Sequence, residues 1–566
     1  MISIQDVHNK RDEITAPGAF FELDTFSVGD AQYTGFKHAP ADMMGVMGAG
    51  RQHLDKPFMV FEDLRYDYAR FFQEVDALAA YLQGELGVKP GDRVVIAMQN
   101  CPHWSASFYA ILSVGAIAVP LNSWSKAEEL DYLVGNADPV CAIVDARRCA
   151  LLKTLDHRAD LILLVTAQLD ACELPANATA LEAALEVGSS ASATSVTVDP
   201  NDVAMIMYTS GSTGKPKGVV TTHRAVAQAV MNMLYLGYLV MSLEGEREYR
   251  GGATGETAML TVPLFHGTGL ISGLLLPAFI GSKVVMMRKW NTETALELID
   301  REKVTTMSSV PAILRDVITS PLRHQYSIES LLRIVAGGAA TPVDLPDLIT
   351  SELPHASRSA GFGMTETVAV GSQMAGVVYD LKVGSAGLPS PIMEFRIADT
   401  NDQPLAAGEN GEIQLRGITC LKEYWNNPEA TERVFTADGW MRTGDLGFLD
   451  EDNFVFITGR SKEIVIRGGE NISPNEIENA AYENPKVKEC VVFGVPDQRM
   501  GEELAMVLYA HEGSALDEAT LREHLASRVA GFKVPKYITL TNGPLPRNNS
   551  EKLDKLACRR MYYPDA

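Results

Sequence analysis

The stretch YTSGSTGKPKG, Tyr208 to Gly218, decides how this 566-residue chain is interpreted. It follows an apolar strand pattern, Met205 to Met207, and precedes a helix pattern that opens near His223. Its glycines let backbone N–H groups approach an anion closely. Its hydroxyls and its two lysines, Lys215 and Lys217, add hydrogen-bond donors and positive charge. Such a loop is suited to phosphate oxygens.

The loop does not match the Walker pattern. That motif needs a glycine five positions before its Gly-Lys pair and Ser or Thr directly after the lysine. Here Thr209 and Pro216 stand at those two places. A mobile glycine–serine linker is the other interpretation, but the strand pattern before the loop and the proline inside it argue against a linker.

Composition and charge set the broad class. With 46% hydrophobic and 21% charged residues the chain has globular composition, and its length predicts two or more domains. The formal net charge of -23 repels nucleic-acid backbones and anionic lipid surfaces, so we expect no nucleic-acid partner. Seven cysteines without a CxxC pair or a Cys/His cluster favour a reducing compartment over a disulfide framework or a zinc site.

The chain has no pattern of a secreted or membrane-spanning protein. Charged residues begin at Asp6, so the N-terminus lacks the apolar stretch of a secretory signal. The most apolar segment, Gly267 to Ser282, is too short to cross a bilayer and contains Pro277. We therefore expect a cytoplasmic protein without an integral membrane span, in which this segment is a buried core element.

Helix and strand patterns alternate along the first part of the chain. Apolar residues recur at helical spacing from Asp67 to Leu86, and a strand pattern follows at Arg93 to Met98. A second helix pattern, His103 to Val114, leads into a strand pattern at Ile117 to Leu121. This order indicates βαβ units with a parallel sheet, and similar alternation continues to about residue 400.

The pattern changes twice toward the C-terminus. Short alternating runs separated by Gly and Pro, from Ile392 to Tyr424, predict a small antiparallel region. After Arg460 the chain restarts with strand patterns at Val487 to Phe493 and Leu504 to Ala510, and with a helix near Leu516 to Val529.

The fold class expected from these patterns is α/β. A large N-terminal domain, residues 1–459, combines parallel-sheet α/β subdomains with a small β region. A hinge at 460–462 leads to a smaller, mobile α+β C-terminal domain, residues 463–566. Since no long linker separates the domains, a few backbone torsions must absorb their relative motion.

Six motifs in order resemble those of the adenylate-forming (ANL) superfamily, which contains acyl-CoA synthetases, peptide-synthetase adenylation domains and firefly-type luciferases. Together they cover most of the chain. The motifs are YTSGSTGKPKG, PLFHGTGL (Pro263 to Leu270), GFGMTET (Gly361 to Thr367), RTGDLG (Arg442 to Gly447), GRSKEIVIRGGENISPNEIE (Gly459 to Glu478) and PRNNSEK (Pro546 to Lys552).

The resemblance implies an ATP site with defined roles. It places Phe362 against adenine, Thr365 on the α-phosphate and Glu366 on magnesium, a metal that takes carboxylate and phosphate oxygens. The residues implied to contact ATP or AMP are Thr209, Ser210, Gly211, Ser212, Thr213, Lys217, Gly338, Ala339, Ala340, Gly361, Phe362, Gly363, Met364, Thr365, Asp445, Arg460 and Lys552.

Four residues late in the chain receive further roles from the resemblance. Asp445 would accept hydrogen bonds from both ribose hydroxyls, with Arg460 as its basic partner, and Lys462 would be the hinge. Lys552 would enter the active site from the small domain and stabilise the charge that converges when a carboxylate attacks the α-phosphorus. The family usually has glycine before this lysine, whereas this chain has Glu551, which affects the geometry of the loop.

The acyl and coenzyme A sites are also implied. His266 resembles the family residue beside the acyl pocket and, with Lys552, Thr365 and Glu366, completes the implied catalytic set. Small residues at Gly267, Gly337 and Gly361 and the apolar segment after His266 favour an apolar acyl group. The run Arg467, Gly468, Gly469 and Glu470 resembles the fatty and medium-chain acyl-CoA ligases and would admit the pantetheine arm of coenzyme A. Read without the motifs, Gly337 to Ala340 is equally well a tight strand-to-helix connection.

The expected activity is that of an AMP-forming acyl-CoA synthetase of fatty-acid or lipid metabolism. It would use ATP, Mg2+ and coenzyme A to convert a fatty, medium-chain or bulky ring acid into a thioester. A free-standing ligase that loads a carrier protein, a luciferase-type oxidase and a non-catalytic nucleotide-binding protein are the alternatives. The sequence names neither the acid nor the oligomeric state, and a homodimer is left open.

Overall fold

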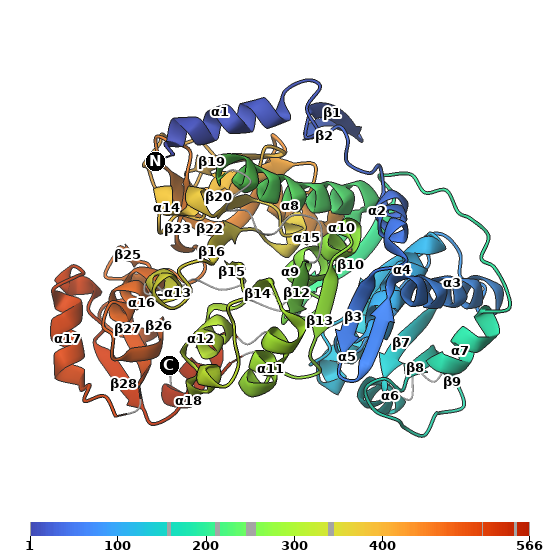
Figure 1. Cartoon of the computed structure of the whole chain (residues 1–566). Helices are drawn as coiled ribbons and strands as arrows, with labels where there is room; N and C mark the ends of the chain where they lie inside the picture. The colour runs from blue at the N-terminus through green and yellow to red at the C-terminus, as the bar shows by residue number, and fades with distance from the viewer. Residues whose placement is uncertain are drawn as a thin grey trace.

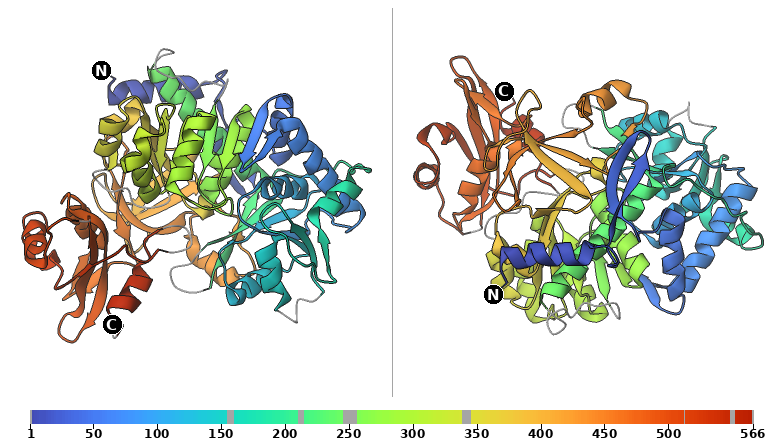
Figure 2. Two further views of the ribbon diagram at one scale, coloured as in Figure 1. Left: turned by 60° about the horizontal axis from the view of Figure 1, so that its bottom comes forward. Right: turned by 90° about the horizontal axis from the view of Figure 1, so that it is seen from above.

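The computed structural model describes residues 2–154, 160–209, 215–244, 256–337, 345–511, 513–547 and 552–564. A larger body is followed by a smaller C-terminal lobe that stands beside it (Figures 1 and 2). The helices of the body named below are α1 (Ile4–Thr15), α2 (Met43–Gly50), α3 (Tyr68–Gly84), α4 (Pro102–Ser113), α5 (Ala127–Ala137), α6 (Ala146–Lys153), α7 (Leu181–Gly188), α8 (His223–Glu244), α9 (Gly267–Leu270), α10 (Leu276–Ile280), α11 (Thr292–Glu302), α12 (Pro311–Thr319), α13 (Leu345–Glu352), α14 (Val377–Leu381) and α15 (Pro428–Val434).

The first sheet confirms the parallel architecture that the alternating patterns predict. Strands β5 and β7 are apolar and almost wholly buried, as a parallel sheet covered on both faces requires. At one side β10 and β11 form an antiparallel hairpin in which Thr209 pairs with Lys217. In spatial order the strands are β21 (Glu423–Tyr424), β11 (Lys217–Thr222), β10 (Val203–Thr209), β6 (Ile117–Pro120), β5 (Arg93–Ala97), β7 (Cys141–Asp145), β8 (Ile162–Thr166) and β9 (Ala178–Ala180).

A second sheet packs beside the first and carries the other half of the body. Its centre is parallel, and β4, β17 and β18 join it antiparallel at the two ends. In spatial order the strands are β18 (Leu388–Pro389), β17 (Ser372–Ala375), β16 (Ser357–Phe362), β15 (Arg333–Ala336), β14 (Thr306–Ser309), β12 (Thr257–Leu260), β13 (Lys283–Met286), β3 (Pro57–Phe61) and β4 (Leu64–Asp67).

The antiparallel region is larger than the sequence patterns predicted. It was expected to end at Tyr424, but it continues to Arg460, because the RTGDLG segment and the strand after it complete the sheet. The prediction was too short because residues 425–440 contain a helix, α15, and turns that interrupt the alternation. The strands are β19 (Met393–Ala398), β20 (Gly411–Gly417), β22 (Met441–Leu449) and β23 (Val455–Arg460).

The C-terminal lobe has a core of its own on each face of one sheet. Along β26, Cys490 and Val492 face one cluster, while Val491 and Phe493 face the other, which is the alternation of a strand covered on both sides. The elements are β24 (Val465–Arg467), β25 (Glu470–Ile472), α16 (Pro474–Tyr482), β26 (Val487–Asp497), β27 (Gly501–Ala510), α17 (Glu518–Ala526), β28 (Tyr537–Thr541) and α18 (Lys555–Tyr562).

Two strongly apolar helical segments lie inside the body. The expected core element at Gly267 is confirmed: α9, a π-helical stretch (Ile271–Leu275) and α10 run through Ile280, and their apolar side chains are largely buried. Helix α8 is long and apolar enough to cross a membrane, but its first turns and Tyr235 are buried against the body. It packs as the core helix of a globular protein does.

Candidate active site

The described residues of the predicted phosphate loop lie on and next to the β10–β11 hairpin. Thr209 ends the first strand and Lys217 opens the second, opposite it. The Lys217 ammonium lies 4.6 Å from the centre of the Tyr424 ring. Burial lowers the pKa of Lys217, and the charge of Lys462 lowers it further. Ser210, Gly211, Ser212 and Thr213 lie outside the described residues.

Glu366 lies beside this lysine, in the short helix Thr365–Thr367. Its side chain is buried, and one carboxylate oxygen, Oε1, accepts a 2.8 Å hydrogen bond from the Tyr424 hydroxyl. Burial raises the pKa of Glu366, while this hydrogen bond and the charge of Lys217 oppose the change. A hard cation or a phosphate-bound metal would find here a carboxylate that is already oriented. Glu366 and Lys217 therefore lie close enough for each charge to act on the other.

The GFGMTET strand presents its glycines to solvent. Gly361 and Gly363 are exposed, and Phe362 is half-buried against the core. A Cβ atom at Gly361 would come within 2.8 Å of the Ser372 carbonyl oxygen, so no larger residue fits without a shift of the backbone. Met364 caps the short helix that carries Thr365.

Asp445 and Arg460 occupy facing positions on β22 and β23. Arg460 Nε donates to Asp445 Oδ1 at 2.9 Å. The aspartate side chain is 7% exposed and the arginine side chain 59% exposed, so the guanidinium covers the carboxylate from the solvent side. Burial raises the pKa of Asp445, and Arg460 opposes that rise.

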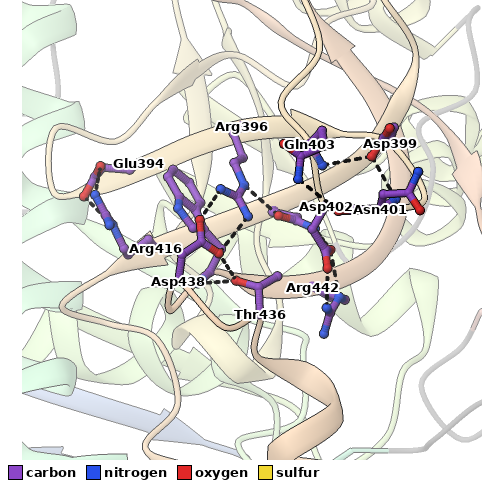
Figure 3. A network of polar contacts seen from close by, with 12 residues as sticks. Glu394, Arg396, Asp399, Asn401, Asp402, Gln403, Arg416, Thr436, Asp438 and Arg442 are labelled. Carbon is purple, nitrogen blue, oxygen red and sulfur yellow. Dashed lines mark hydrogen bonds and ion pairs between the residues drawn. The ribbon is translucent and has the colours of Figure 1, made fainter.

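A network of charged side chains anchors the strand that carries Asp445 (Figure 3). Arg442, three residues earlier on β22, donates to both carboxylate oxygens of Asp402, at 3.0 and 2.5 Å. Gln414 on β20 links Asp402 to Arg396, which pairs in turn with Asp438. The bidentate geometry fixes the register of β22 against its neighbours.

Lys552 comes from the C-terminal lobe and lies near residues of the larger body. Its surroundings lower its pKa, first by desolvation and then through the charge of Arg460. Its own charge reaches His266, whose pKa falls to about 4, mainly because the imidazole is buried. His266 is therefore neutral near pH 7. The lobe is also close to α12, because Arg547 and Lys488 act on the pKa of Asp316.

The glycines predicted to line the acyl pocket differ in how much space surrounds them. Among the residues that the structure describes, none has an atom within 4 Å of a Cβ placed on Gly337, and a Cβ on Gly267 would touch Ala369 Cβ at 3.4 Å. Ala339 and its neighbours Gly338 and Ala340 lie outside the described residues, as does Glu551.

The predicted coenzyme A residues form the turn of the β24–β25 hairpin. Arg467 pairs with Glu470, and Gly468 and Gly469 between them have φ values of 60° and 92°. The turn itself therefore requires the glycines. Arg467 Nε donates to Glu503 Oε2 at 2.7 Å, which orients the start of the hairpin. Lys462 is exposed in the turn before β24.

Sequence reasoning missed Tyr424, the residue that joins Lys217 to Glu366. It stands on the two-residue strand β21, next to β11 of the phosphate-loop hairpin. Tyr424 ends the segment that was predicted to be antiparallel, and an aromatic residue at that place gives no signal of this contact. Only the pairing of distant segments in the first sheet reveals it.

The fold and site define a class. A two-lobed α/β protein brings a phosphate-loop hairpin, a buried carboxylate, an Asp–Arg pair and a lysine from the second lobe to one region, which is the arrangement of a nucleotide-dependent, adenylate-forming enzyme.

Comparisons with known proteins establish the family. Residues 48–425 match the AMP-binding enzyme family, and residues 476–552 match the AMP-binding enzyme C-terminal domain. The chain belongs to this family of adenylate-forming enzymes, and it is an acid–thiol ligase of the AMP-forming type.

Several relatives match along nearly their whole length. A feruloyl-CoA synthase from Amycolatopsis sp is 33% identical over 495 residues, which are 88% of this chain and 94% of that protein. A long-chain-fatty-acid–CoA ligase from Mycobacterium tuberculosis is 30% identical over 503 residues, with 88% and 94% covered. The ATP-bound structure of MatB from Rhodopseudomonas palustris is similar with a TM-score of 0.78 and 26% identity, covering 91% of this chain and 98% of that one.

Proposed function

We propose that this ligase activates an apolar carboxylic acid with ATP as an acyl-adenylate, releases pyrophosphate, and transfers the acyl group to coenzyme A. One observation carries the proposal. Lys552, which belongs to the small lobe, acts electrostatically on His266 and is acted on by Arg460, which pairs with Asp445. The ammonium is thus within electrostatic range of the expected acyl-side histidine and of the arginine of the expected ribose-binding pair, which supports the proposal.

The first half-reaction needs charge stabilisation more than it needs proton transfer. A carboxylate oxygen of the acid attacks the α-phosphorus, a new P–O bond forms, and the bond to pyrophosphate breaks. Negative charge from both reactants converges in that transition state. An ammonium at Lys552 would stabilise it electrostatically, and more strongly where the bound substrates exclude water. His266 would border the acid as a neutral imidazole.

The nucleotide would be held by residues from three segments. Asp445 suits two ribose hydroxyls because a carboxylate offers two acceptor oxygens, one of which also receives Arg460. Lys217 and Thr209 would meet the phosphates, with Phe362 beside the adenine and Thr365 at the α-phosphate. Ser210 to Thr213, which lie outside the described residues, belong to the same proposal as further phosphate contacts.

Glu366 fits a magnesium ion by its chemistry. It is a buried carboxylate of which Tyr424 already holds one oxygen. Mg2+ prefers one or two carboxylates together with phosphate oxygens and waters. When bound, the ion would neutralise charge on the departing pyrophosphate. In this chain Glu366 holds its position and Lys217 adds positive charge beside it.

The second half-reaction would follow a rotation of the C-terminal domain, residues 463–566, about Lys462. The thiolate of coenzyme A attacks the carbonyl carbon of the acyl-adenylate, the bond to AMP breaks, and a thioester remains. The Arg467–Glu470 hairpin would then border the pantetheine passage. Its glycine turn leaves little side-chain bulk at that point.

The acid is proposed to be apolar and of the fatty, medium-chain or ring type. The buried segment after His266 and the small residues Gly267, Gly337 and Gly361 support an apolar pocket. Relatives named for feruloyl and long-chain fatty substrates also support this range. A cytoplasmic location accompanies the proposal, because acyl-CoA chemistry draws on intracellular ATP and coenzyme A.

The test is a panel of acids incubated with the protein, ATP and MgCl2. The proposal expects acid-dependent release of AMP and pyrophosphate, and a thioester when coenzyme A is added. Hydroxylamine traps the adenylate when coenzyme A is left out. Release of ADP, or no turnover with any acid, would contradict the proposal, and hydroxamate without thioester would favour transfer to a carrier protein.

A further inference from the structure

Lys555 is a partly buried cation that lies three residues after Lys552 and contacts two carboxylates at once. Its Nζ atom lies 2.9 Å from Glu463 Oε2 and 3.0 Å from Glu478 Oε1. Desolvation lowers the pKa of Lys555, but the two carboxylates raise it by more, so this pKa lies above its ordinary value. Lys555 is therefore charged near pH 7, and both of these contacts are ion pairs.

The first of these carboxylates belongs to the turn at the proposed hinge. The Glu463 N–H donates to the Arg460 carbonyl oxygen at 3.0 Å, so the turn closes over Ser461 and Lys462. Arg460 itself pairs with Asp445 on the facing strand of the larger body. Because the backbone bond spans the torsions of Lys462, a rotation about that residue would open the turn. The turn would therefore hold Glu463 against the larger body only in the present orientation of the lobe.

The second carboxylate fixes the same ammonium to the core of the C-terminal lobe. Glu478 lies on α16, and its side chain is largely buried. Its Oε1 atom also accepts a 2.7 Å hydrogen bond from the Val492 N–H on β26. A carboxylate that is held by a central strand of the lobe is a well-oriented partner for an ammonium. Lys555 therefore connects the core of the lobe with the hinge turn.

The segment that carries Lys552 ends directly at this connection. Its base is closed by a hydrogen bond of 2.8 Å from the Asp554 N–H to the Pro546 carbonyl oxygen. Asp554 is also the N-cap of α18, and Lys555 is the first residue of that helix. Only Leu553 and Asp554 separate the two lysines in the chain. A displacement of the first turn of α18 would therefore displace Lys552 as well.

We propose that the Lys555–Glu463 ion pair is a strap that holds Lys552 in position for adenylation and ceases to act when the C-terminal lobe rotates. The inference rests on the proposed two-step reaction and adds Lys555 and Glu463 to it as positioning residues. In the present orientation the hinge turn and the strap together tie the first turn of α18 to the larger body. Rotation about Lys462 opens the turn, so the strap no longer ties α18 to that body and Lys552 can leave the site.

Lys555→Met tests the strap in the two half-reactions measured separately. We expect kcat for acid-dependent pyrophosphate release to fall about tenfold or more, because a catalytic group displaced by about 1 Å can lose about 10²-fold in rate. Thioester formation from supplied acyl-AMP and coenzyme A should change by less than about twofold, because the strap does not act in that step. Lys555→Arg keeps the charge and should recover most of the lost rate of adenylation.

Glu463→Gln removes the charge of the other partner and should also slow adenylation alone. The double variant Glu463→Gln/Lys555→Met should be no slower than Lys555→Met, because the two substitutions remove the same contact. This second route keeps the test decisive if Lys555→Met does not fold, since Glu463→Gln then carries the same comparison of half-reactions.

Lys533→Met is the matched control. Lys533 forms an ion pair in the same lobe, with its Nζ atom 2.7 Å from Glu476 Oε2, and its side chain is 23% exposed against 27% for Lys555. This pair joins α16 to the short helix Gly531–Lys533 and includes no residue of the hinge turn or of α18. We expect both half-reactions to stay unchanged in Lys533→Met, with melting temperatures measured for all variants.

The outcomes separate a positioning role from a structural one. A loss of adenylation alone, restored by Lys555→Arg and absent from Lys533→Met, supports the strap. A parallel loss of both half-reactions would mean that the ion pair only stabilises the lobe, and it would overturn the inference while the proposed function stands. An unchanged rate of adenylation in Lys555→Met would overturn it equally. Failure of the unaltered protein to release pyrophosphate with any acid would overturn the proposed function and the inference together.

Discussion

Arg460 covers Asp445 from the solvent side, with its Nε atom 2.9 Å from Asp445 Oδ1 on the facing strand. The carboxylate is buried and the guanidinium is exposed, so the pair presents a buried acceptor beneath an exposed positive charge. Two hydroxyl donors of a ribose would find the acceptor already oriented, and a phosphate would find the arginine.

Asp445→Asn keeps the shape and removes the charge. We expect the KM for ATP to rise about tenfold with a smaller change in kcat, because charge-assisted hydrogen bonds are roughly twice as strong as neutral ones. Asp76→Asn is the control, since Asp76 on α3 is an ion-paired aspartate that takes no part in the β22 network. Equal effects of both variants on the KM for ATP would contradict the ribose assignment.

Arg442→Lys tests the network that anchors β22. Lysine keeps the charge but cannot form the two-pronged contact that Arg442 makes with Asp402. We expect a several-fold rise in the KM for ATP through misplacement of Asp445. Arg416→Lys removes a similar two-pronged contact, to Glu394, in the same sheet and should leave that KM unchanged. A fall in melting temperature without a change in the KM for ATP would mean that the network stabilises the fold and does not position Asp445.

Much of this arrangement could be predicted from the sequence because it is local. Strand β5 is largely apolar, and α3 begins directly after Asp67, whose side chain caps the helix by accepting from the Arg70 N–H. The glycine-rich and charged motifs were recognised because their roles depend on a few residues close together in sequence. Asp445 and Arg460 fall on facing strands only fifteen residues apart, a spacing that favours pairing.

Tyr424→Phe tests the contact that the motifs did not reveal. Loss of the hydroxyl frees Glu366 Oε1 from its 2.8 Å hydrogen bond. We expect the Mg2+ concentration at half-maximal pyrophosphate release to rise several-fold, because the carboxylate would no longer be oriented. The response to ATP at saturating Mg2+ should change less. An unchanged Mg2+ titration would mean that Glu366 does not bind the metal.

The pH dependence of adenylation reports on Lys552. Its pKa lies below the ordinary value of 10.5, first because of desolvation and then because of Arg460. A lowered pKa means that the ammonium loses its proton, and its charge, at a lower pH than a free lysine does. We therefore expect kcat/KM for ATP, measured without coenzyme A, to fall on the alkaline side below pH 10.5.

Lys552→Arg provides the control for that profile. A guanidinium keeps its charge across the same pH range. The kcat/KM for ATP of any activity that remains should therefore no longer fall on the alkaline side. If kcat/KM fell at the same alkaline pH in both proteins, a group other than Lys552 would cause the fall.

The parts that sequence could not predict depend on segments far apart in the chain. Tyr424 reaches Glu366 because β21 joins the edge of the first sheet. Arg11 reaches Pro389 only because α1 lies along α8. The extent of the antiparallel sheet β19–β20–β22–β23 was underestimated because α15 and its turns separate β20 from β22 in the sequence. The hydrophobic periodicity of a strand predicts which of its faces is buried, but it does not identify the strand that pairs with it.

The central claim is that Lys552 serves adenylation and not thioester formation. The direct measurement compares Lys552→Ala with the unaltered protein in two assays, acid-dependent pyrophosphate release and thioester formation from supplied acyl-AMP and coenzyme A. We expect the first rate to fall by about 10²–10³-fold, as when a preorganised charge is removed from a transition state, while the second stays within a few-fold. Equal loss in both assays would contradict the account.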